Sequence, residues 1–431
     1  MTREMMTGNL AAAWGARLAD VDYIPAFPIT PQTEIVEALA GWCDGGNPAA
    51  RFVTLDSEHS MMTAAGAAAA AGARVFTATS SQGLLYAFEV LYTIAGWRVP
   101  LVLVNVSRAL ASPITLEPDH NDVLSARDSG FLQIHAETCQ EVLDSVLMAY
   151  RIAEDQRVCL PVLVNLDGFY LSFTREPVRK PEPDQVRAFL PPYRPAHLGF
   201  KASAPQSLGV AVLGGASYTY FRHQMQLASL NALSVHQEAA ADFARLFGRR
   251  YDLVEGYRLE DAEDVLIMSN AFATKGKAAV DQARTKGRRV GLLRLRVIRP
   301  WPADVITAAL RGRRAVAVLD QNLAPGLGGI LFQEVAAALY HEPARPKALC
   351  SFIGGLGGKD ISEGEFEAIF AQTAAAGDRG RGIGPVLLYT EGEQHNMQEL
   401  LAIAGNEKQP SAISSQRSAG DQDGSLSSPD S

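Results

Sequence analysis

The chain has 431 residues, a length that predicts about three domains of ordinary size. Hydrophobic residues make up 47% and charged residues 20%, which is typical of a globular protein and excludes a collagen-like or wholly disordered chain. Lys and Arg (39) are outnumbered by Asp and Glu (47), so the net charge is −8. Nonspecific nucleic-acid binding needs a basic surface, and this balance argues against it.

Four cysteines, Cys43, Cys139, Cys159 and Cys350, are scattered along the chain without a CxxC spacing. Disulfide scaffolds and zinc or iron–sulfur sites need denser or clustered thiols. We therefore expect free thiols in a reducing compartment and no metal site on this chain. The N-terminus lacks the apolar core of a secretory signal, and the Ala-rich run at 62–75 is too short and weakly apolar to span a bilayer. These features predict a soluble, cytoplasmic protein with no membrane partner.

The first part of the chain alternates segments typical of helices and of strands. In chain order, helix-like segments at 9–19, 31–42, 57–72, 81–97 and 138–155 alternate with strand-like segments at 22–30, 51–56, 73–80, 99–107 and 159–169. The later strands are apolar on both faces, which indicates a parallel sheet covered by helices on both sides. Right-handed crossovers then place the loops after the strands at one edge, where ligands usually bind.

A Pro-rich stretch at 176–207 predicts a linker, and a second βα series follows it. The strand-like segments of this series lie at 207–215, 264–270, 288–298, 314–322 and 348–355. The sequence thus predicts an α/β fold with two parallel-sheet domains. The expected bounds are 1–175 and 208–365 for the domains, 366–404 for a C-terminal extension, and 405–431 for a Ser-rich, disordered tail.

Polar side chains stand at four of the predicted strand ends in the first domain. They are Thr30, Glu58, Ser80, Ser81 and Arg108. Because the carboxyl ends of parallel strands share one edge, these side chains could converge on one pocket. A guanidinium grips a carboxylate through paired hydrogen bonds, so the set suggests a site for a small anion and a polar heterocycle.

Each of these residues also has an ordinary structural role open to it. A carboxylate at Glu58 would offset the dipole of the helix that it begins, and Thr30 before a proline would be a helix N-cap. The Ser80–Gly83 turn would cap the next helix, and Arg108 would form a surface ion pair. His59 would be a packed or solvated side chain. Residue types and spacing alone leave these alternatives open.

Several long segments, taken together, carry a more specific signal. They are PITPQTEIVEAL at 28–39, DSEHSMMTAAGAAAAAGARVFTATSSQG at 56–83, NVSRALASP at 105–113 and DHNDVLSARDSGFLQ at 119–133. In this order they resemble the alpha subunit of pyruvate:ferredoxin oxidoreductase, and the resemblance extends over roughly residues 8–365. It implies a thiamine-diphosphate-fold pyrimidine-binding domain followed by a transketolase C-terminal-like domain.

The resemblance also implies an activity. Members of this family oxidatively decarboxylate 2-oxo acids with thiamine diphosphate, form an acyl-CoA, and pass electrons through iron–sulfur clusters to ferredoxin. The family's thiamine-activating glutamate falls on Glu58, and its substrate-contacting threonine and arginine fall on Thr30 and Arg108. Its turn beside the cofactor falls on Ser80, Ser81, Gln82 and Gly83.

Two features that the family reaction needs are missing from this sequence. There is no GDG…N stretch to hold Mg²⁺ and the diphosphate, and there is no cysteine cluster. The resemblance implies that Mg²⁺ and the iron–sulfur clusters belong to the beta and delta subunits, and that a gamma subunit is associated with CoA. The active site would then form between this chain and the beta subunit.

Three positions depart from the family pattern. Phe27 stands where tyrosine is usual, Leu116–Pro118 replaces an aromatic and a small residue, and the IMSNA run at 267–271 replaces a more glycine-rich turn. We expect oxidative decarboxylation of pyruvate to acetyl-CoA and CO2. The alternatives are the same reaction on 2-oxoglutarate or a branched-chain 2-oxo acid, or a noncatalytic partner subunit.

Overall fold

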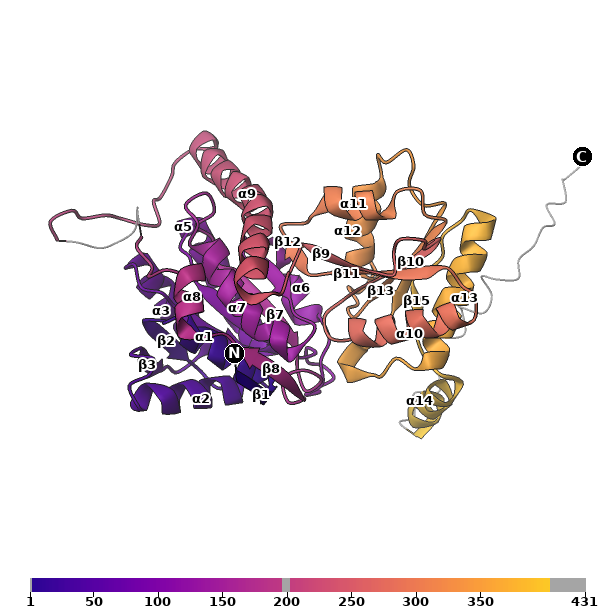
Figure 1. Cartoon of the computed structure of the whole chain (residues 1–431), viewed down its shortest axis with the longest axis horizontal. Helices are drawn as coiled ribbons and strands as arrows, with labels where there is room; N and C mark the ends of the chain where they lie inside the picture. Colours follow the sequence, from indigo (N-terminus) through magenta and orange to yellow (C-terminus); the bar gives the residue numbers. More distant parts are fainter. Residues whose placement is uncertain (1, 196–201, 404–431) are drawn as a thin grey trace, which may run out of the picture. The chain divides into compact units, whose positions relative to one another are not determined.

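The computed structural model describes residues 2–195 and 202–403 of the chain (Figure 1). The chain divides into two compact units, Met1–Leu387 and Leu388–Ser431. Among its described residues, the second unit contains helix α14 (Glu391–Ile403). The tail expected at 405–431 lies outside the described residues.

The first α/β half of the larger unit is built on a five-stranded sheet with the strand order β12-β6-β7-β5-β4. Its strands are β4 (Phe76–Thr79), β5 (Val102–Ser107), β6 (Leu132–His135), β7 (Val162–Asp167) and β12 (Val297–Arg299). Strands β4 to β7 run parallel, and all of their residues are buried. A short parallel pair, β2 (Tyr23–Ala26) and β3 (Arg51–Thr54), is bridged to the residue before β4.

Helices separate these strands in the order that the sequence predicts. They are α1 (Gly8–Leu18), α2 (Thr33–Asp44), α3 (Glu58–Ala70), α4 (Ser81–Tyr86), α5 (Phe88–Trp97), α6 (Asn121–Ser125), the 3₁₀ turn η1 (Ala126–Asp128) and α7 (Cys139–Ala153). Helix α7 packs against α1 and against strands β5 and β7. The predicted parallel α/β fold class is confirmed for this half.

The stretch at 176–207, which we expected to be a linker, contains regular structure in its described part. Strand β8 (Arg175–Lys180) pairs antiparallel with β1 (Thr2–Thr7), and helix α8 (Pro183–Phe189) follows. The pairing satisfies backbone groups that a free linker would leave to water. A two-stranded ribbon also tolerates a proline in β8, because each strand keeps one open edge. Residues 196–201 lie outside the described part.

The segment at 207–215 is not the buried strand that its apolar run suggests. Its backbone is outside any strand, and the long helix α9 (Gly215–Phe247), which the sequence analysis did not predict, begins at its end (Figure 1). Val210 is 64% and Leu213 100% exposed, so the run faces solvent. Short apolar runs fit several structures, and tertiary pairing decides between them.

The second α/β half is built on a six-stranded sheet with the order β15-β14-β13-β10-β11-β9. Its strands are β9 (Val254–Tyr257), β10 (Asp264–Ser269), β11 (Val290–Leu295), β13 (Ala315–Asp320), β14 (Ala348–Ile353) and β15 (Val386–Leu387). Strand β9 is antiparallel to β11, and the other pairs are parallel.

Helices of this half extend beyond the boundary expected at 365. They are α10 (Ala273–Thr285), α11 (Ala303–Leu310), α12 (Ile330–Leu339), the 3₁₀ turn η2 (Leu356–Gly358) and α13 (Glu363–Arg379). Helix α13 packs against β13 and β14, and β15 adds a strand beside β14. The second half therefore continues to Leu387, through much of the stretch that we expected to be an extension.

One run of sequence serves both sheets. The apolar segment at 288–298, expected to be a single strand, divides into β11 of the second sheet and β12, which pairs antiparallel with β6 of the first. The first sheet is thus completed by a strand that lies far away in the sequence. This pairing ties the two α/β halves together inside the larger unit.

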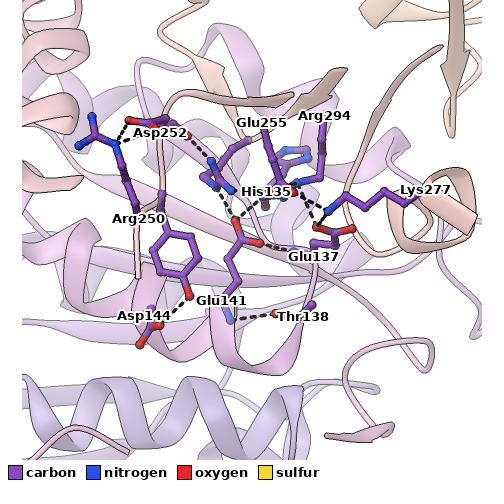
Figure 2. Close-up of polar contacts among 12 residues, drawn as sticks. His135, Glu137, Thr138, Glu141, Asp144, Arg250, Asp252, Glu255, Lys277 and Arg294 are labelled. Carbon is purple, nitrogen blue, oxygen red and sulfur yellow. Dashed lines mark hydrogen bonds and ion pairs between the residues drawn. The ribbon is translucent and has the colours of Figure 1, made fainter. Parts of the chain in front are cut away.

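Buried charges reinforce this junction. Arg294 on β11 is fully buried, and its guanidinium contacts Glu141 at 2.8 Å, Glu255 at 3.0 Å and Glu137 at 3.2 Å. Lys277 of α10 contacts Glu137 and Glu255, each at 2.6 Å. Figure 2 shows these five side chains pointing toward one another, and we call them the Arg294 cluster. Two of them come from the first half (Glu137 and Glu141) and three from the second.

Candidate functional site

Glu58 is the first residue of α3, in the chain after β3. The helix begins here because the Ser57 hydroxyl accepts a hydrogen bond from the Ser60 N–H at 3.2 Å, which satisfies one of the free donors of the first turn. The Glu58 side chain is only 6% exposed. A carboxylate that merely offset the helix dipole would stay in water, because burying a charge costs free energy.

The turn at Ser80–Gly83, which follows β4 and forms the start of α4, lies directly against Glu58. A side-chain carbon placed on Gly83 would be 2.6 Å from Glu58 Oε1 and 2.6 Å from Thr79 Oγ1. Such approaches are far shorter than van der Waals contact, so the position accepts glycine and little else. The turn therefore presents bare backbone to the carboxylate.

Gly83→Ala should lower the free energy of unfolding by about 1–3 kcal/mol, because the added methyl group overlaps the oxygens of Glu58 and Thr79. Gly96→Ala is the matched control. Gly96 lies on α5 with nothing within 4 Å of the added carbon, so alanine should be neutral or stabilise by up to about 1 kcal/mol. Urea unfolding of the two variants checks this, and equal midpoints would contradict the close approach at Gly83.

Arg108 follows β5 and reaches two other loops. Its Nη1 donates a hydrogen bond to the Thr30 carbonyl at 2.7 Å, and its Nη2 donates to Gln82 Oε1 at 2.5 Å. The residue is 8% exposed; burial lowers the pKa of its guanidinium, while the carboxylates of Asp122 and Glu58 oppose that shift. Arg108 is therefore a buried connector rather than a surface ion pair.

Thr30 is exposed, and the contact it makes with Arg108 uses its backbone carbonyl. It is not a helix N-cap, because α2 begins at Thr33 with Gln32 in the capping position. The structure brings the predicted residues of this site together as expected from the strand ends. The connected set is Thr30, Glu58, Gln82, Gly83 and Arg108, with Ser80 and Ser81 in the same turn as Gln82.

Asp122 is a buried residue of this site that sequence reasoning missed. It lies on α6, is fully buried, and accepts hydrogen bonds from the N–H groups of Ser81 at 3.0 Å and Arg108 at 3.3 Å. Burial raises the pKa of Asp122 to about 6. Its place in the DHND run, 14 residues after Arg108, gave no signal that separated it from an ordinary acidic residue at a helix start.

Some buried polar atoms of the site have no hydrogen-bond partner in the described part of the chain. They are Thr79 Oγ1, Ser80 Oγ and Arg108 Nε. Together with the Glu58 carboxylate over Gly83, they offer donors and acceptors to a polar ring and to an anion. These residues fit the aminopyrimidine half of thiamine diphosphate. Across residues 2–195 and 202–403, no group of three or more His, Cys, Asp or Glu side chains is placed to hold a metal ion.

Two family models match this chain. Residues 14–241 match the family model of the thiamine-diphosphate-binding domain of pyruvate flavodoxin/ferredoxin oxidoreductase. The chain belongs to this oxidoreductase family. Residues 262–366 match core domain II of pyruvate:ferredoxin oxidoreductase, which covers most of the second α/β half. The resemblance carried by the sequence segments is confirmed.

Relatives match over nearly the whole length of both chains. The subunit PorA of pyruvate synthase from Methanothermobacter thermautotrophicus is 42% identical over 373 residues, which cover 86% of this chain and 96% of the relative. PorA from Pyrococcus furiosus is 40% identical and covers 84% and 90%. The subunit VorA of ketoisovalerate oxidoreductase from Pyrococcus horikoshii is 39% identical and covers 85% and 92%.

Solved structures confirm the fold. A 2-oxoglutarate:ferredoxin oxidoreductase from Magnetococcus marinus, solved with 2-oxoglutarate, coenzyme A and succinyl-CoA bound, aligns with a TM-score of 0.64 at 18% identity. The alignment covers 87% of this chain and 65% of that chain. A split-gene transketolase aligns with a TM-score of 0.52 at 12% identity, over 86% of this chain and 99% of the other. No helix in the described part of this chain is long and apolar enough to cross a membrane.

Proposed function

We propose that this chain is the alpha subunit of a pyruvate:ferredoxin oxidoreductase, which oxidatively decarboxylates pyruvate to acetyl-CoA and CO2 and passes the electrons to ferredoxin. The match to PorA subunits over nearly the full length of both chains is the main support. The buried arrangement of Glu58, Gly83 and Arg108 adds to it, because those residues have the types and contacts that the reaction requires.

Thiamine diphosphate, when bound, supplies a carbon nucleophile and an electron sink for decarboxylation. In this proposal the Glu58 carboxylate shares a proton with a ring nitrogen of the cofactor's aminopyrimidine. Glycine at position 83 leaves room for the Glu58 carboxylate itself, because a side-chain carbon there would lie 2.6 Å from Glu58 Oε1. The buried hydroxyl of Ser80 is available to hydrogen-bond the ring as well. The chain's own part of the chemistry is thus to orient the ring and to control its proton.

Arg108 and Thr30 are assigned to the substrate. The guanidinium is already fixed by the Thr30 carbonyl and by Gln82, while its Nε is buried without a partner. A small 2-oxo acid would be held by this guanidinium and by the Thr30 hydroxyl, in the geometry needed for attack at the keto carbon. Gln82 has a positioning role, because it holds the guanidinium rather than the reacting atoms.

The rest of the site is assigned to partners. Mg²⁺ and the diphosphate would be held by a beta subunit, iron–sulfur clusters would lie on partner chains that include a delta subunit, and CoA would involve a gamma subunit. Exposed apolar side chains next to the site support a protein partner there. Leu85 and Tyr86 end α4, and Ile114 and Leu116 lie in the loop after Arg108. We place the complex in the cytoplasm, consistent with four free cysteines.

The same reaction on a branched-chain 2-oxo acid is the second candidate. It is supported by VorA relatives that are nearly as similar as the PorA relatives. The departure at Leu116–Pro118 lies in a loop that follows Arg108, and its Leu116 is 47% exposed. A partner chain covering that loop would shape the part of the pocket that receives the substrate side chain.

Reconstitution with the partner chains tests the proposal. The complex is assayed with pyruvate, 2-oxoglutarate and 2-oxoisovalerate, with CoA, and with ferredoxin as electron acceptor. We expect the highest kcat/KM with pyruvate, and complete dependence on CoA and thiamine diphosphate. A preference for 2-oxoisovalerate would favour the second candidate. A correctly assembled complex that turns over none of the three acids would reject an enzymatic role in favour of a noncatalytic one.

Arg108→Lys should lower kcat/KM for the 2-oxo acid by about ten- to a hundredfold and leave the Kd of thiamine diphosphate within about twofold. Lysine keeps the charge but loses the fork that spans the Thr30 carbonyl and Gln82, and one charge-assisted contact is worth about 1.5–3 kcal/mol. Arg98→Lys is the matched control, because Arg98 is also partly buried and donates to the Val158 carbonyl. Steady-state kinetics and calorimetry separate the outcomes. Loss of cofactor binding with an unchanged KM would remove Arg108 from the substrate side of the site.

A further inference from the structure

We propose that Asp122 is a positioning residue for the substrate side of this site, which fixes Arg108 and the Ser80–Gly83 turn relative to each other without touching the reacting atoms. The inference rests on the proposed function, and it adds a residue that the sequence analysis did not single out. Three observations carry it: the set of groups that Asp122 accepts from, the strain in the turn, and the anchoring of its own segment.

Asp122 accepts hydrogen bonds from several chain segments at once. Its Oδ2 accepts from the N–H of Ser81 at 3.0 Å, from the N–H of Arg108 at 3.3 Å and from Asn105 Nδ2 at 3.1 Å. Its Oδ1 lies 3.0 Å from Ser107 Oγ and accepts from the Val123 N–H at 2.7 Å. A fully buried carboxylate with donors on both oxygens is held in one place and holds its donors in turn.

Two of the three backbone donors, the N–H groups of Ser81 and Arg108, belong to the two parts of the site. The N–H groups of Ser81 and Arg108 both donate to Oδ2 of Asp122. The same two segments also meet through their side chains, because Nη2 of Arg108 donates to the amide oxygen of Gln82, the residue after Ser81. One carboxylate therefore joins the two segments. Displacing either segment would change the distance over which the guanidinium meets Gln82.

The turn needs such an anchor because it is strained. Ser81 has φ of 49°, a left-handed conformation that costs a non-glycine residue about 1–2 kcal/mol. Its hydroxyl also lies 3.1 Å from the Ala109 carbonyl, so the turn is attached to the segment of Arg108 a second time. The hydrogen bond to Asp122 offsets part of the strain and keeps Gly83 against Glu58.

The segment that carries Asp122 is itself anchored to the second α/β half. The His120 N–H donates to the Gln321 carbonyl at 2.8 Å, and Asn121 Oδ1 accepts from the Leu323 N–H at 3.1 Å. His120 Nε2 lies 2.8 Å from Asp167 at the end of β7. Asp122 is thus placed from outside the two loops that it joins, which is what a positioning residue requires.

Asp122→Asn, in the reconstituted complex, tests the proposal. Asparagine has the same shape, but an NH2 group replaces one of the two carboxylate oxygens. Because both oxygens of Asp122 accept hydrogen bonds, the NH2 group faces donors in either orientation of the amide, and the hydrogen bonds on that side are lost. We expect the KM for pyruvate to rise about ten- to thirtyfold with kcat lowered less than threefold. Amide hydrogen exchange should accelerate at residues 80–83 and 107–109 and stay unchanged in the second half.

Asp144→Asn is the matched control. Asp144 is also fully buried and accepts from Arg249 at 2.6 Å and Tyr251 at 2.7 Å, away from the site loops. We expect this variant to lower the melting temperature without changing KM. A purely structural role for Asp122 predicts the same behaviour for both variants, and that result would overturn the proposal.

Two further outcomes keep the test decisive. If Asp122→Asn does not fold, Ser107→Ala replaces it in the test, because it removes one donor at Oδ1 of Asp122. This variant should raise the KM for pyruvate about two- to fourfold, and an unchanged KM would overturn the proposal. If the wild-type complex turns over no 2-oxo acid, the proposed function fails, but local exchange at 80–83 and 107–109 still reports on the anchoring. An active wild type with normal KM and normal exchange in Asp122→Asn contradicts this inference alone.

Discussion

Replacing Glu58 with glutamine should lower the kcat of the assembled complex by about 10²–10⁴-fold, the usual contribution of a positioned acid–base group. Glutamine is close in size and shape, so it fits beside Gly83 as the carboxylate does, in the space that a side-chain carbon on residue 83 would take. It still offers a hydrogen bond to a ring nitrogen, but it does not take up and release a proton there. Binding of thiamine diphosphate should therefore change much less than turnover.

Glu34→Gln separates this role from a helix-dipole effect. Glu34 lies in the first turn of α2, as Glu58 does in α3, and it accepts a hydrogen bond from Asn9 at 3.4 Å. If Glu58 only offset the dipole of its helix, both variants would lose about 0.3–1 kcal/mol of stability and keep their turnover. We expect normal turnover in Glu34→Gln, measured as 2-oxo-acid-dependent reduction of ferredoxin. Near-normal turnover in Glu58→Gln would remove Glu58 from the chemistry.

The alternation of helices and strands was predictable because it follows from local patterns. Strands β5 and β7 are buried along their whole length, and a parallel sheet covered by helices accepts such runs without polar alternation. The convergence of Glu58 and Arg108 was predictable for a related reason. In a parallel sheet the strand ends alone place these loops at one edge.

Pairing between distant segments was not predictable in this way. The run at 288–298 reads as one strand, and nothing local shows that its last residues pair with β6 of another sheet. Helix α9 was missed because no element was predicted between the strand-like runs at 207–215 and 264–270. Asp122 was missed because its partners Ser81 and Arg108 lie 41 and 14 residues away, and only the folded chain brings them together.

Arg294→Met should lower the free energy of unfolding by about 3–5 kcal/mol, the largest stability effect that we expect from a single substitution in this chain. Methionine fills similar volume, so the loss comes from electrostatics rather than from a cavity. The buried carboxylates of Glu137 and Glu141 would lose the guanidinium that contacts both. Since Arg294 lies on β11 and these glutamates belong to the first α/β half, the variant also weakens the junction between the halves.

The pKa of Glu141 shows how the two buried arginines together stabilise this carboxylate. Burial alone would raise the pKa of Glu141, but the guanidinium groups of Arg294 and Arg296 outweigh it and lower the pKa from 4.5 to about 2. At about 1.4 kcal/mol per pKa unit, this corresponds to about 3 kcal/mol of stabilisation. Because the pKa is depressed in the folded state, the stabilisation is fully present above pH 4.5 and is lost as the pH falls toward 2. The difference between wild type and Arg294→Met should therefore shrink between pH 7 and pH 3.

Two comparisons check that the effect belongs to buried charge. Arg289→Met removes an arginine that is 60% exposed in its ion pair with Glu263, and it should change stability by less than about 1 kcal/mol. Arg294→Met takes one cationic partner from Glu141, which keeps Arg296. Adding Glu141→Gln removes that buried carboxylate, so the double variant should be more stable than Arg294→Met alone, whereas the effects of mutations at independent sites would add. Urea unfolding at pH 7 measures all four proteins. A double variant less stable than Arg294→Met would mean that the 2.5 Å contact with Arg296 still balances the charge of Glu141. Arg294 would then stabilise the fold mainly through Glu137 and Glu255.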